Sequence, residues 1–314
     1  MSMMKAVCLE RCGRASTVNL SDVPRPKPGP GEVLVHVHAA GITLTELDWG
    51  ETWRTRNGIP RAHPIPGHEL CGEVAAVGVG TPDLHTGDRV YGLTDFARDG
   101  AEAEYAIATA SEIARAPRSV DDLHAAAVPL AALTAWQALF DRARLEAGHR
   151  LLIHGAAGGV GCVAVQLARW AGAHVIGTAS ESNLDLVRAL GADEVVDHEA
   201  VHFEDVVSDV DVVLDCVGGD TLTRSFGVLV DDGLLISIAQ PIPDDRADDP
   251  RVHAQFFVVH PDRAQLERIA ELVDQGVIVP IVDAVVPLER AQEAYEHLAK
   301  GHARGKTILK VIPS

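Results

Sequence analysis

A run of glycines in the middle of the chain has the composition of a loop that cradles phosphate. Residues 154–161 read His-Gly-Ala-Ala-Gly-Gly-Val-Gly, between a predicted strand at 151–154 and a predicted helix at 160–170. Glycines let such a turn close tightly, and the free N–H groups and dipole of the following helix attract an anion. Because the next predicted strand falls at 174–178, where a dinucleotide-binding βαβ unit needs it, we interpret the run as a pyrophosphate site. The alternative is a glycine turn that only packs a strand on a helix.

The residues after that second strand bear on which dinucleotide is bound. An acidic side chain there suits the adenosine ribose of NAD, whereas a small or basic residue accommodates the 2′-phosphate of NADP. The chain has Thr178-Ala179-Ser180-Glu181-Ser182-Asn183, with no acid at the strand end itself, and Ser180 could donate to a phosphate. Glu181 could repel that phosphate or point to solvent. The pattern favours NADPH and leaves NADH open.

The elements expected around these residues divide the chain into two parts. Up to about residue 120, stretches such as 33–38, 72–79 and 89–92 predict strands separated by glycine and proline turns. From residue 121, predicted helices alternate with strands, which indicates right-handed βαβ units and a parallel sheet. A first helix is expected at 121–142, broken near Pro129.

Bulk composition excludes several classes of function. The 314 residues carry 27 basic and 45 acidic side chains, a net charge of −18, which argues against general binding to nucleic acid or to acidic membranes. The first residues, Met1-Ser2-Met3-Met4-Lys5, lack the apolar run typical of a signal peptide, and no stretch of the sequence predicts a membrane span of about 20 apolar residues. The five cysteines are scattered without Cys-x-x-Cys spacing, so we expect free thiols and a cytoplasmic protein.

Short motifs in order along nearly the whole chain resemble the medium-chain dehydrogenase/reductase superfamily, most closely its zinc-free quinone oxidoreductase-like branch. They include Pro28-Gly29-Pro30-Gly31-Glu32-Val33, Pro66-Gly67-His68-Glu69, Gly87-Asp88-Arg89-Val90, Leu133-Thr134-Ala135-Trp136, Leu190-Gly191-Ala192-Asp193 and Asp215-Cys216-Val217-Gly218-Gly219. The resemblance implies an α/β chain with a GroES-like β-barrel domain at 1–120 and 262–314. It implies a Rossmann dinucleotide-binding domain, a doubly wound parallel sheet, at 121–261. It also implies a cleft between the domains as the active site, and a homodimer.

The same resemblance assigns cofactor-binding residues. Gly158, Gly159 and Val160 would meet the pyrophosphate. Ser180 would face the adenosine ribose, and Asn183 belongs to the same cofactor-binding set. The nicotinamide side would be lined by Thr134, Val217 and Ala239, followed near the ring by Phe256 and Phe257. Lys306 could approach a 2′-phosphate.

Zinc-dependent relatives hold a catalytic metal with an early Cys, a His-Glu pair and a late Cys. His68 and Glu69 match the pair, but Thr43 stands at the early Cys position and no Cys lies between Cys71 and Cys162. Because catalytic zinc normally needs three protein ligands plus water, we predict no metal. His68 is then a pocket histidine bonded to Glu69 or backbone, or a proton relay. A zinc alcohol dehydrogenase with unorthodox ligands is the third possibility.

Without a Lewis acid, the resemblance favours a conjugated acceptor, which takes hydride at carbon. Many reductases of the branch carry a tyrosine donor in the segment that corresponds to 43–53, and this chain has none there. Thr43, Glu46 and His68 are the polar candidates for proton donor, with water as a further one. Glu46 could equally be a solvated loop carboxylate. Trp49, Trp53 and Phe96 could contact a flat substrate, or pack the loop on the barrel.

The predicted function is therefore NADPH-dependent hydride transfer to a quinone or an α,β-unsaturated carbonyl compound, without zinc. One alternative is a tailoring reductase of secondary metabolism that acts on a larger conjugated substrate. Another is a non-enzymatic NADP(H)-binding redox sensor, because a dinucleotide-binding fold does not by itself fix function.

Overall fold

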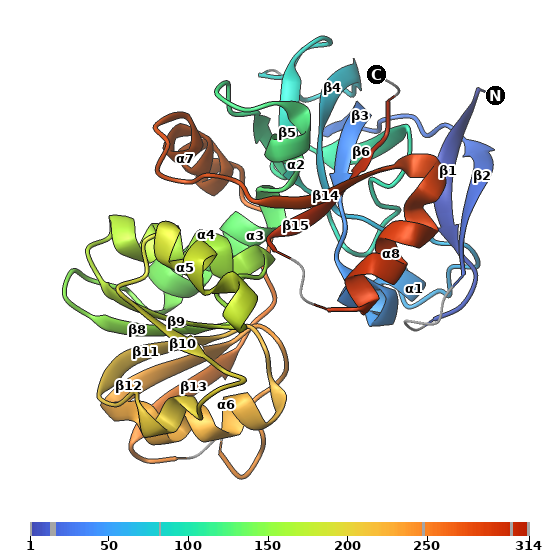
Figure 1. The fold of residues 1–314 in the computed structure, drawn as a ribbon. Helices are drawn as coiled ribbons and strands as arrows, with labels where there is room; N and C mark the ends of the chain where they lie inside the picture. Colours follow the sequence, from blue (N-terminus) through green and yellow to red (C-terminus); the bar gives the residue numbers. More distant parts are fainter. Residues whose placement is uncertain (1, 13–16, 82, 247–248, 302–303, 313–314) are drawn as a thin grey trace. The chain divides into compact units, whose positions relative to one another are not determined.

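The computed structural model describes the chain except residues 1, 13–16, 82, 247–248, 302–303 and 313–314. The chain divides into two compact units (Figure 1). The first unit takes in Met1–Leu130, His260–Gly276 and Pro280–Ser314, and the second takes in Ala131–Val259 and Val277–Val279. In the described part of the chain, no helix is both long and apolar enough to cross a membrane.

Strands dominate the first unit, as the glycine- and proline-punctuated sequence predicts. A seven-stranded sheet runs in the order β14-β15-β3-β4-β5-β7, with β6 paired to β3. Neighbours pair antiparallel, except that β14 runs parallel to β15. The strands are β3 (Glu32–Gly41), β4 (Glu69–Val77), β5 (Arg89–Leu93), β6 (Tyr105–Thr109), β7 (Ile113–Arg115), β14 (Val282–Pro287) and β15 (Lys306–Lys310). A separate antiparallel pair consists of β1 (Met3–Leu9) and β2 (Val18–Pro24).

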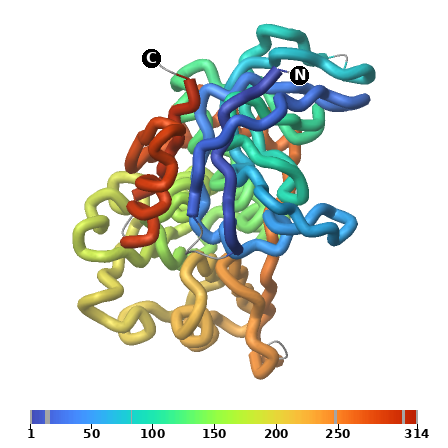
Figure 2. The backbone as a smooth tube through the Cα atoms, turned by 90° about the vertical axis from the view of Figure 1, so that its right-hand side faces the viewer, coloured from blue at the N-terminus to red at the C-terminus, as the bar shows by residue number. Residues whose placement is uncertain are grey.

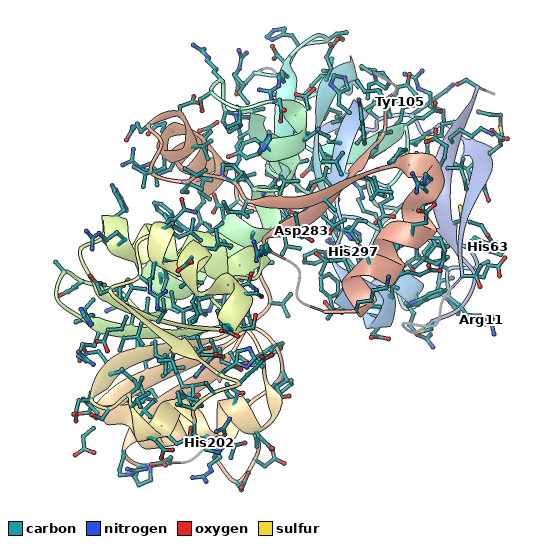
Figure 3. The ribbon with its side chains drawn as sticks, viewed as in Figure 1. Arg11, His63, Tyr105, His202, Asp283 and His297 are labelled. Carbon is teal, nitrogen blue, oxygen red and sulfur yellow. The ribbon has the colours of Figure 1, made fainter. Side chains whose placement is uncertain are left out.

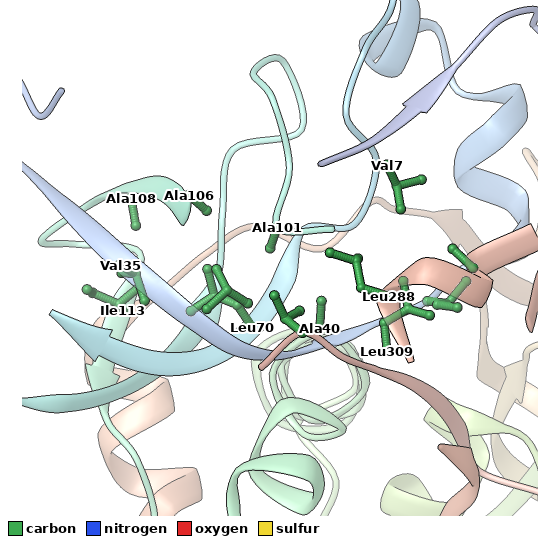
Figure 4. Packing of buried hydrophobic residues seen from close by; sticks show 14 of the residues in the cluster. Val7, Val35, Ala40, Leu70, Ala101, Ala106, Ala108, Ile113, Leu288 and Leu309 are labelled. Atoms are coloured by element: carbon green, nitrogen blue, oxygen red, sulfur yellow. The ribbon is translucent and has the colours of Figure 1, made fainter. Parts of the chain in front are cut away.

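The core of the first unit joins the beginning and the end of the chain. On β3 the side chains alternate as a half-buried strand requires: Val35 and Val37 are buried, and His36 between them is half-buried. The valines belong to one apolar cluster with Leu70 of β4 and Leu309 of β15 (Figure 4). Each such buried side chain contributes about 1.5–3 kcal/mol. The C-terminal strand is therefore an integral part of this core.

Helix α8 (Ala291–Ala299) brings the C-terminal segment beside the N-terminal strands, as Figure 2 shows. The Tyr295 hydroxyl donates a 2.6 Å hydrogen bond to the buried carboxyl of Glu102. On the exposed side, His297 of α8 pairs with Asp283 of β14 at 2.9 Å (Figure 3). These contacts hold α8 on the sheet.

The second unit is the parallel sheet that the sequence predicts. Its six strands run in the order β10-β9-β8-β11-β12-β13, and every neighbouring pair is parallel. They are β8 (Arg150–His154), β9 (His174–Ala179), β10 (Glu194–Asp197), β11 (Val210–Asp215), β12 (Leu229–Ser237) and β13 (Val252–Phe256). The chain starts at β8, adds strands on one side, then returns and adds strands on the other. This is the doubly wound Rossmann topology, and its switch point, where such sheets bind ligands, lies between β8 and β11.

Most of the helices follow the predicted pattern. The predicted helix at 121–142 is divided into α2 (Asp122–Ala126), α3 (Pro129–Trp136) and a π-helical turn (Gln137–Arg142). The break falls before Pro129, which opens α3 because proline is tolerated in a first turn. The other α-helices of the described chain, besides α8, are α1 (Gly50–Trp53), α4 (Gly159–Trp170), α5 (Leu184–Ala189), α6 (Gly219–Ser225) and α7 (Arg263–Asp274). The sequence did not predict α1, α6 or the edge strand β13.

Candidate functional site

The glycine run forms a tight turn between β8 and α4 with room for an anion. Gly155 has a φ of +69°, a left-handed conformation that favours glycine. A Cβ on Gly161 would collide with the carbonyl oxygen of Gly155, so only glycine lets α4 approach the turn. No side chain caps α4, and the first N–H groups of a helix have no partner within it. Gly159 and Val160 can therefore offer N–H groups to a pyrophosphate, whereas Gly158 donates its own N–H to Gly155 at 3.0 Å.

A buried aspartate shapes the neighbouring loops at the carboxyl edge of the same sheet. Asp215, the last residue of β11, accepts the N–H groups of Val217 at 3.0 Å and Gly218 at 2.9 Å. Its other oxygen accepts the Ser237 hydroxyl at 2.8 Å, and that hydroxyl oxygen accepts the N–H of Ala239 at 3.2 Å. Val217 stays 55 % exposed, so an apolar surface is held in place at the switch point. Sequence reasoning missed Asp215 and Ser237 as positioning residues, although a charged residue that ends an apolar strand is a signal.

Ser180 and Asn183 lie together at the end of β9, where the adenosine ribose is expected. The Asn183 side-chain amide donates to the Ser180 hydroxyl oxygen at 3.2 Å, and the Ser182 hydroxyl oxygen lies 3.4 Å from that of Ser180. Asn183 is buried, and its carbonyl Oδ1 has no hydrogen-bond partner in the described structure. Glu181 is exposed at the start of the next turn. The residues present therefore fit a dinucleotide, with hydroxyl and amide groups at the ribose end.

The residues expected around the nicotinamide differ in how accessible they are. Phe256 ends β13 and is partly exposed, whereas Phe257 is buried with the Arg142 guanidinium 3.9 Å from its ring centre. Thr134 is buried on α3. Phe256 is thus the aromatic side chain with free surface, and Phe257 has one face already covered.

His68 and Glu46 form a buried pair in the first unit. Both side chains are 1 % exposed, and Nδ1 of His68 contacts Oε1 of Glu46. That carboxylate also accepts the Gly67 N–H at 2.9 Å, and Nε2 of His68 lies 3.3 Å from the carbonyl oxygen of Arg98. Burial alone would lower the pKa of His68, but the Glu46 carboxylate and the Arg98 carbonyl together raise it. Of the two partners expected for His68, the structure shows backbone and not Glu69, and of the two interpretations of Glu46 it excludes the solvated loop carboxylate.

Lys306, Glu69 and Thr43 form a second buried cluster. The Lys306 ammonium contacts Oε1 of Glu69, and it donates to the Ile42 carbonyl oxygen at 3.0 Å and to the Thr43 hydroxyl oxygen at 3.1 Å. Burial raises the pKa of Glu69 more than Lys306 and the Leu130 N–H lower it. The three N–H groups of the ammonium are thereby all used. This corrects the expectation that Lys306 approaches a 2′-phosphate.

The aromatic candidates separate into two groups. The Phe96 ring lies edge-on to both Trp49 and His68, with 5.1 Å between ring centres in each case. Trp53 instead donates its indole N–H to the Leu47 carbonyl at 2.9 Å and packs against the apolar core. Trp49 and Phe96 therefore stay candidates for substrate contact, whereas the structure makes Trp53 a packing residue.

Two protein-family models match the chain, one in its N-terminal half and one in its C-terminal half. A family model described as an alcohol dehydrogenase GroES-like domain matches residues 29–118. A second model, described as a zinc-binding dehydrogenase, matches residues 190–309. The first match confirms the expected GroES-like domain.

Individual proteins match over most of their length. A probable zinc-binding oxidoreductase, mitochondrial, from Arthroderma benhamiae is 35% identical over 317 residues, which cover 95% of this chain and 94% of that protein. A mitochondrial NAD(P)H oxidoreductase of Homo sapiens is 30% identical over 324 residues, 90% of this chain and 82% of the relative. The solved structure of the quinone oxidoreductase from Coxiella burnetii superimposes with a TM-score of 0.91 at 30% identity and covers 99% of this chain and 100% of its own.

Proposed function

The chain belongs to the medium-chain dehydrogenase/reductase superfamily, and on that basis we propose that it transfers hydride from NADPH to a quinone or an α,β-unsaturated carbonyl compound without zinc. Its relatives are named oxidoreductases, so the chain is an oxidoreductase with a nicotinamide cofactor. The alternative of a non-enzymatic redox sensor is therefore set aside.

The observation that carries the zinc-free proposal is that the residues at the metal-ligand positions are committed to other partners. His68 pairs with Glu46, while Thr43 and Glu69 both contact the Lys306 ammonium. A zinc ion at Glu69 would place two cations against one buried carboxylate. Across the described residues, no group of three or more His, Cys, Asp or Glu side chains could hold a metal ion. A conjugated acceptor suits such a site, because it takes hydride at carbon with only a proton donor at its oxygen.

The preference for NADPH rests on the end of β9. The strand ends at Ala179 and Ser180 follows, so no carboxylate occupies the place where an acidic side chain binds the ribose of NAD. The Ser180 hydroxyl oxygen accepts from Asn183, so its proton can be donated to a phosphate oxygen or to the Ser182 hydroxyl 3.4 Å away. Glu181 is exposed. The proposal therefore assigns the 2′-phosphate to Ser180.

The chain's own residues bind and orient the reactants. When bound, the reduced nicotinamide supplies the hydride. The N–H groups of Gly159 and Val160 hold the pyrophosphate, and Asp215 fixes the loops that present Val217 and Ala239 to the ring. Fixing the ring and the acceptor in one geometry replaces a bimolecular encounter by a preorganised one.

Metal analysis of the active enzyme tests the zinc-free proposal. We expect well below one zinc per chain after dialysis against a chelator, together with undiminished NADPH-dependent reduction of a quinone. One zinc retained per chain, with activity that disappears on its removal and returns on its addition, would establish the zinc alternative instead.

We also propose, from the resemblance alone, that the enzyme is a cytoplasmic homodimer. Sedimentation of the purified protein tests the assembly, and a single species at the monomer mass would contradict it.

A further inference from the structure

Three neighbouring strands bring the Thr43, Glu69 and Lys306 side chains to one place. The order β15-β3-β4 puts β3 in the middle, with both neighbours antiparallel to it. Glu69 is the first residue of β4, Lys306 is the first residue of β15, and Thr43 comes two residues after β3 ends. Because antiparallel strands begin where their neighbour ends, the three side chains meet at one edge of the sheet.

The cluster occupies space that the backbone leaves for it. Gly41 pairs with Glu69 across β3 and β4, and a Cβ on Gly41 would collide with the Glu69 carboxylate. Lys306 is 7 % exposed and Glu69 is 1 % exposed. Removing two charges from water costs several kcal/mol per ion, so such a pair is weak evidence for stability. Because stability alone does not explain the buried Glu69–Lys306 pair, for which Gly41 makes room, we look for its role in the chemistry.

Thr43 is the member of the cluster that remains accessible. Its side chain is half-buried, whereas Lys306 and Glu69 are enclosed. The Thr43 oxygen accepts an N–H of Lys306 at 3.1 Å, which leaves the hydroxyl proton to be donated outward. A hydroxyl that accepts from a cation is a stronger donor than an isolated one. Charge that develops on an oxygen near Thr43 would therefore meet a polarised O–H with a fixed ammonium behind it.

We propose that Thr43, backed by the Lys306 ammonium and Glu69, is the proton donor to the oxygen of the quinone or α,β-unsaturated carbonyl substrate. This rests on the proposed function. As hydride forms a C–H bond at the acceptor carbon, the electron pair of the π system moves to the substrate oxygen. That oxygen takes the Thr43 proton, and Thr43 takes a proton from Lys306. The Lys306 amine recovers its proton from water through the accessible Thr43 hydroxyl, so each cycle consumes one hydride and one solvent proton.

The other polar candidates are less suited to this role. Both ring nitrogens of His68 face protein atoms, Glu46 on one side and the Arg98 carbonyl on the other, and the side chain is 1 % exposed. Glu46 is equally enclosed. The His68–Glu46 pair therefore supports the wall beside Phe96, and the accessible proton is that of Thr43.

The test compares Thr43→Val, which removes the hydroxyl at nearly constant volume, with Thr43→Ser, which keeps it. General acid catalysis contributes about 10²–10⁴-fold, so we expect Thr43→Val to lower kcat at least about 100-fold, with KM changed by less than about threefold. Thr43→Ser should recover most of the rate. The solvent isotope effect on kcat should increase in Thr43→Val, because proton transfer becomes limiting. The Kd for NADPH, from its fluorescence, should stay unchanged in both variants.

A binding measurement with 4-nitrophenol provides a readout that does not need turnover. Its phenolate absorbs differently from its phenol, so the spectrum reports the charge that the site stabilises. Bound probe should be ionised more in the wild type than in Thr43→Val, and least in the double variant Lys306→Met/Glu69→Gln, which leaves no unpaired buried charge. Circular dichroism and urea unfolding check that each variant folds.

The inference is overturned if Thr43→Val keeps kcat within threefold of the wild type, or if the probe is ionised equally in all three proteins. Those outcomes leave the proposed function intact, because the wild type still reduces the acceptor. Failure of the wild type to oxidise NADPH with any quinone or enone would instead overturn the proposed function, and the 4-nitrophenol spectra would still decide whether Thr43 and Lys306 form an oxyanion site.

Discussion

Gly158→Asp should abolish binding of the dinucleotide without unfolding the protein. Gly158 is the N-cap of α4, with φ −75° and ψ 177°, an extended conformation that any residue adopts. The nearest atom to an added Cβ is the Gly155 carbonyl oxygen at 3.3 Å, a tight but tolerable contact. Aspartate is among the preferred N-cap residues, and relative to glycine it should stabilise the helix by about a few tenths of a kcal/mol. The fold is therefore expected to survive.

The loss of affinity follows from charge. An aspartate at the cap would accept a helix N–H that the pyrophosphate otherwise uses, and it would place a second anion beside the phosphates. Two like charges about 4 Å apart repel by about 4 kcal/mol at an effective dielectric constant of about 20, which corresponds to about a 10³-fold rise in Kd. Stability and affinity should therefore change in opposite directions.

Fluorescence titration with NADPH and urea unfolding measure the two effects separately. Gly158→Asn is the matched control, since it supplies the same cap without the charge and should lose much less affinity. Unchanged NADPH affinity in Gly158→Asp would show that the pyrophosphate lies elsewhere. If Gly158→Asn bound as weakly as Gly158→Asp, exclusion by volume would be the cause and the electrostatic reasoning would be refuted.

Three further variants test the packing and the buried ionisable groups. Gly161→Ala places a Cβ against the Gly155 carbonyl, so the urea midpoint should fall by the equivalent of about 1–3 kcal/mol; an unchanged midpoint would contradict this close approach. The pKa of His68 in the folded protein is raised above the usual value of 6.5. Its ion pair with Glu46 therefore stabilises the fold fully below pH 6.5, and this stabilisation is lost as pH rises through the folded pKa. Glu46→Gln should remove this pH dependence from the free energy of unfolding measured in urea. Burial raises the pKa of Glu102 from 4.5 to about 8, so this carboxyl increasingly destabilises the folded state as pH rises between these values. Glu102→Gln should therefore be more stable than the wild type at pH 8 and equal to it near pH 4. Equal stability of the two proteins at both pH values would refute the raised pKa.

Much of the second unit could be predicted from the sequence, because buried parallel strands are apolar runs with glycine turns between them. The edge strand Val252–Phe256 escaped prediction, since its sequence Val-His-Ala-Gln-Phe is mixed and its conformation depends on pairing with β12. Helix α6 escaped because it opens with Gly218 and Gly219, both at positive φ, which resemble a turn.

The partners of the polar residues in the first unit were harder to predict. Adjacent residues at the start of a strand point to opposite faces, so His68 and Glu69 cannot contact the same side chain. His68 contacts Glu46, and Glu69 contacts Lys306. The first point follows from strand geometry alone. The pairing of Glu69 with Lys306 depends on the order β15-β3-β4, which no local pattern encodes.

Zinc-free hydride transfer from NADPH can be measured by following the consumption of NADPH and NADH in parallel by the zinc-depleted enzyme, against a panel of quinones and enones. We expect turnover with a clear preference for NADPH, and the best acceptor will define the substrate shape. Turnover only after zinc is restored, or preferential oxidation of NADH, would contradict it.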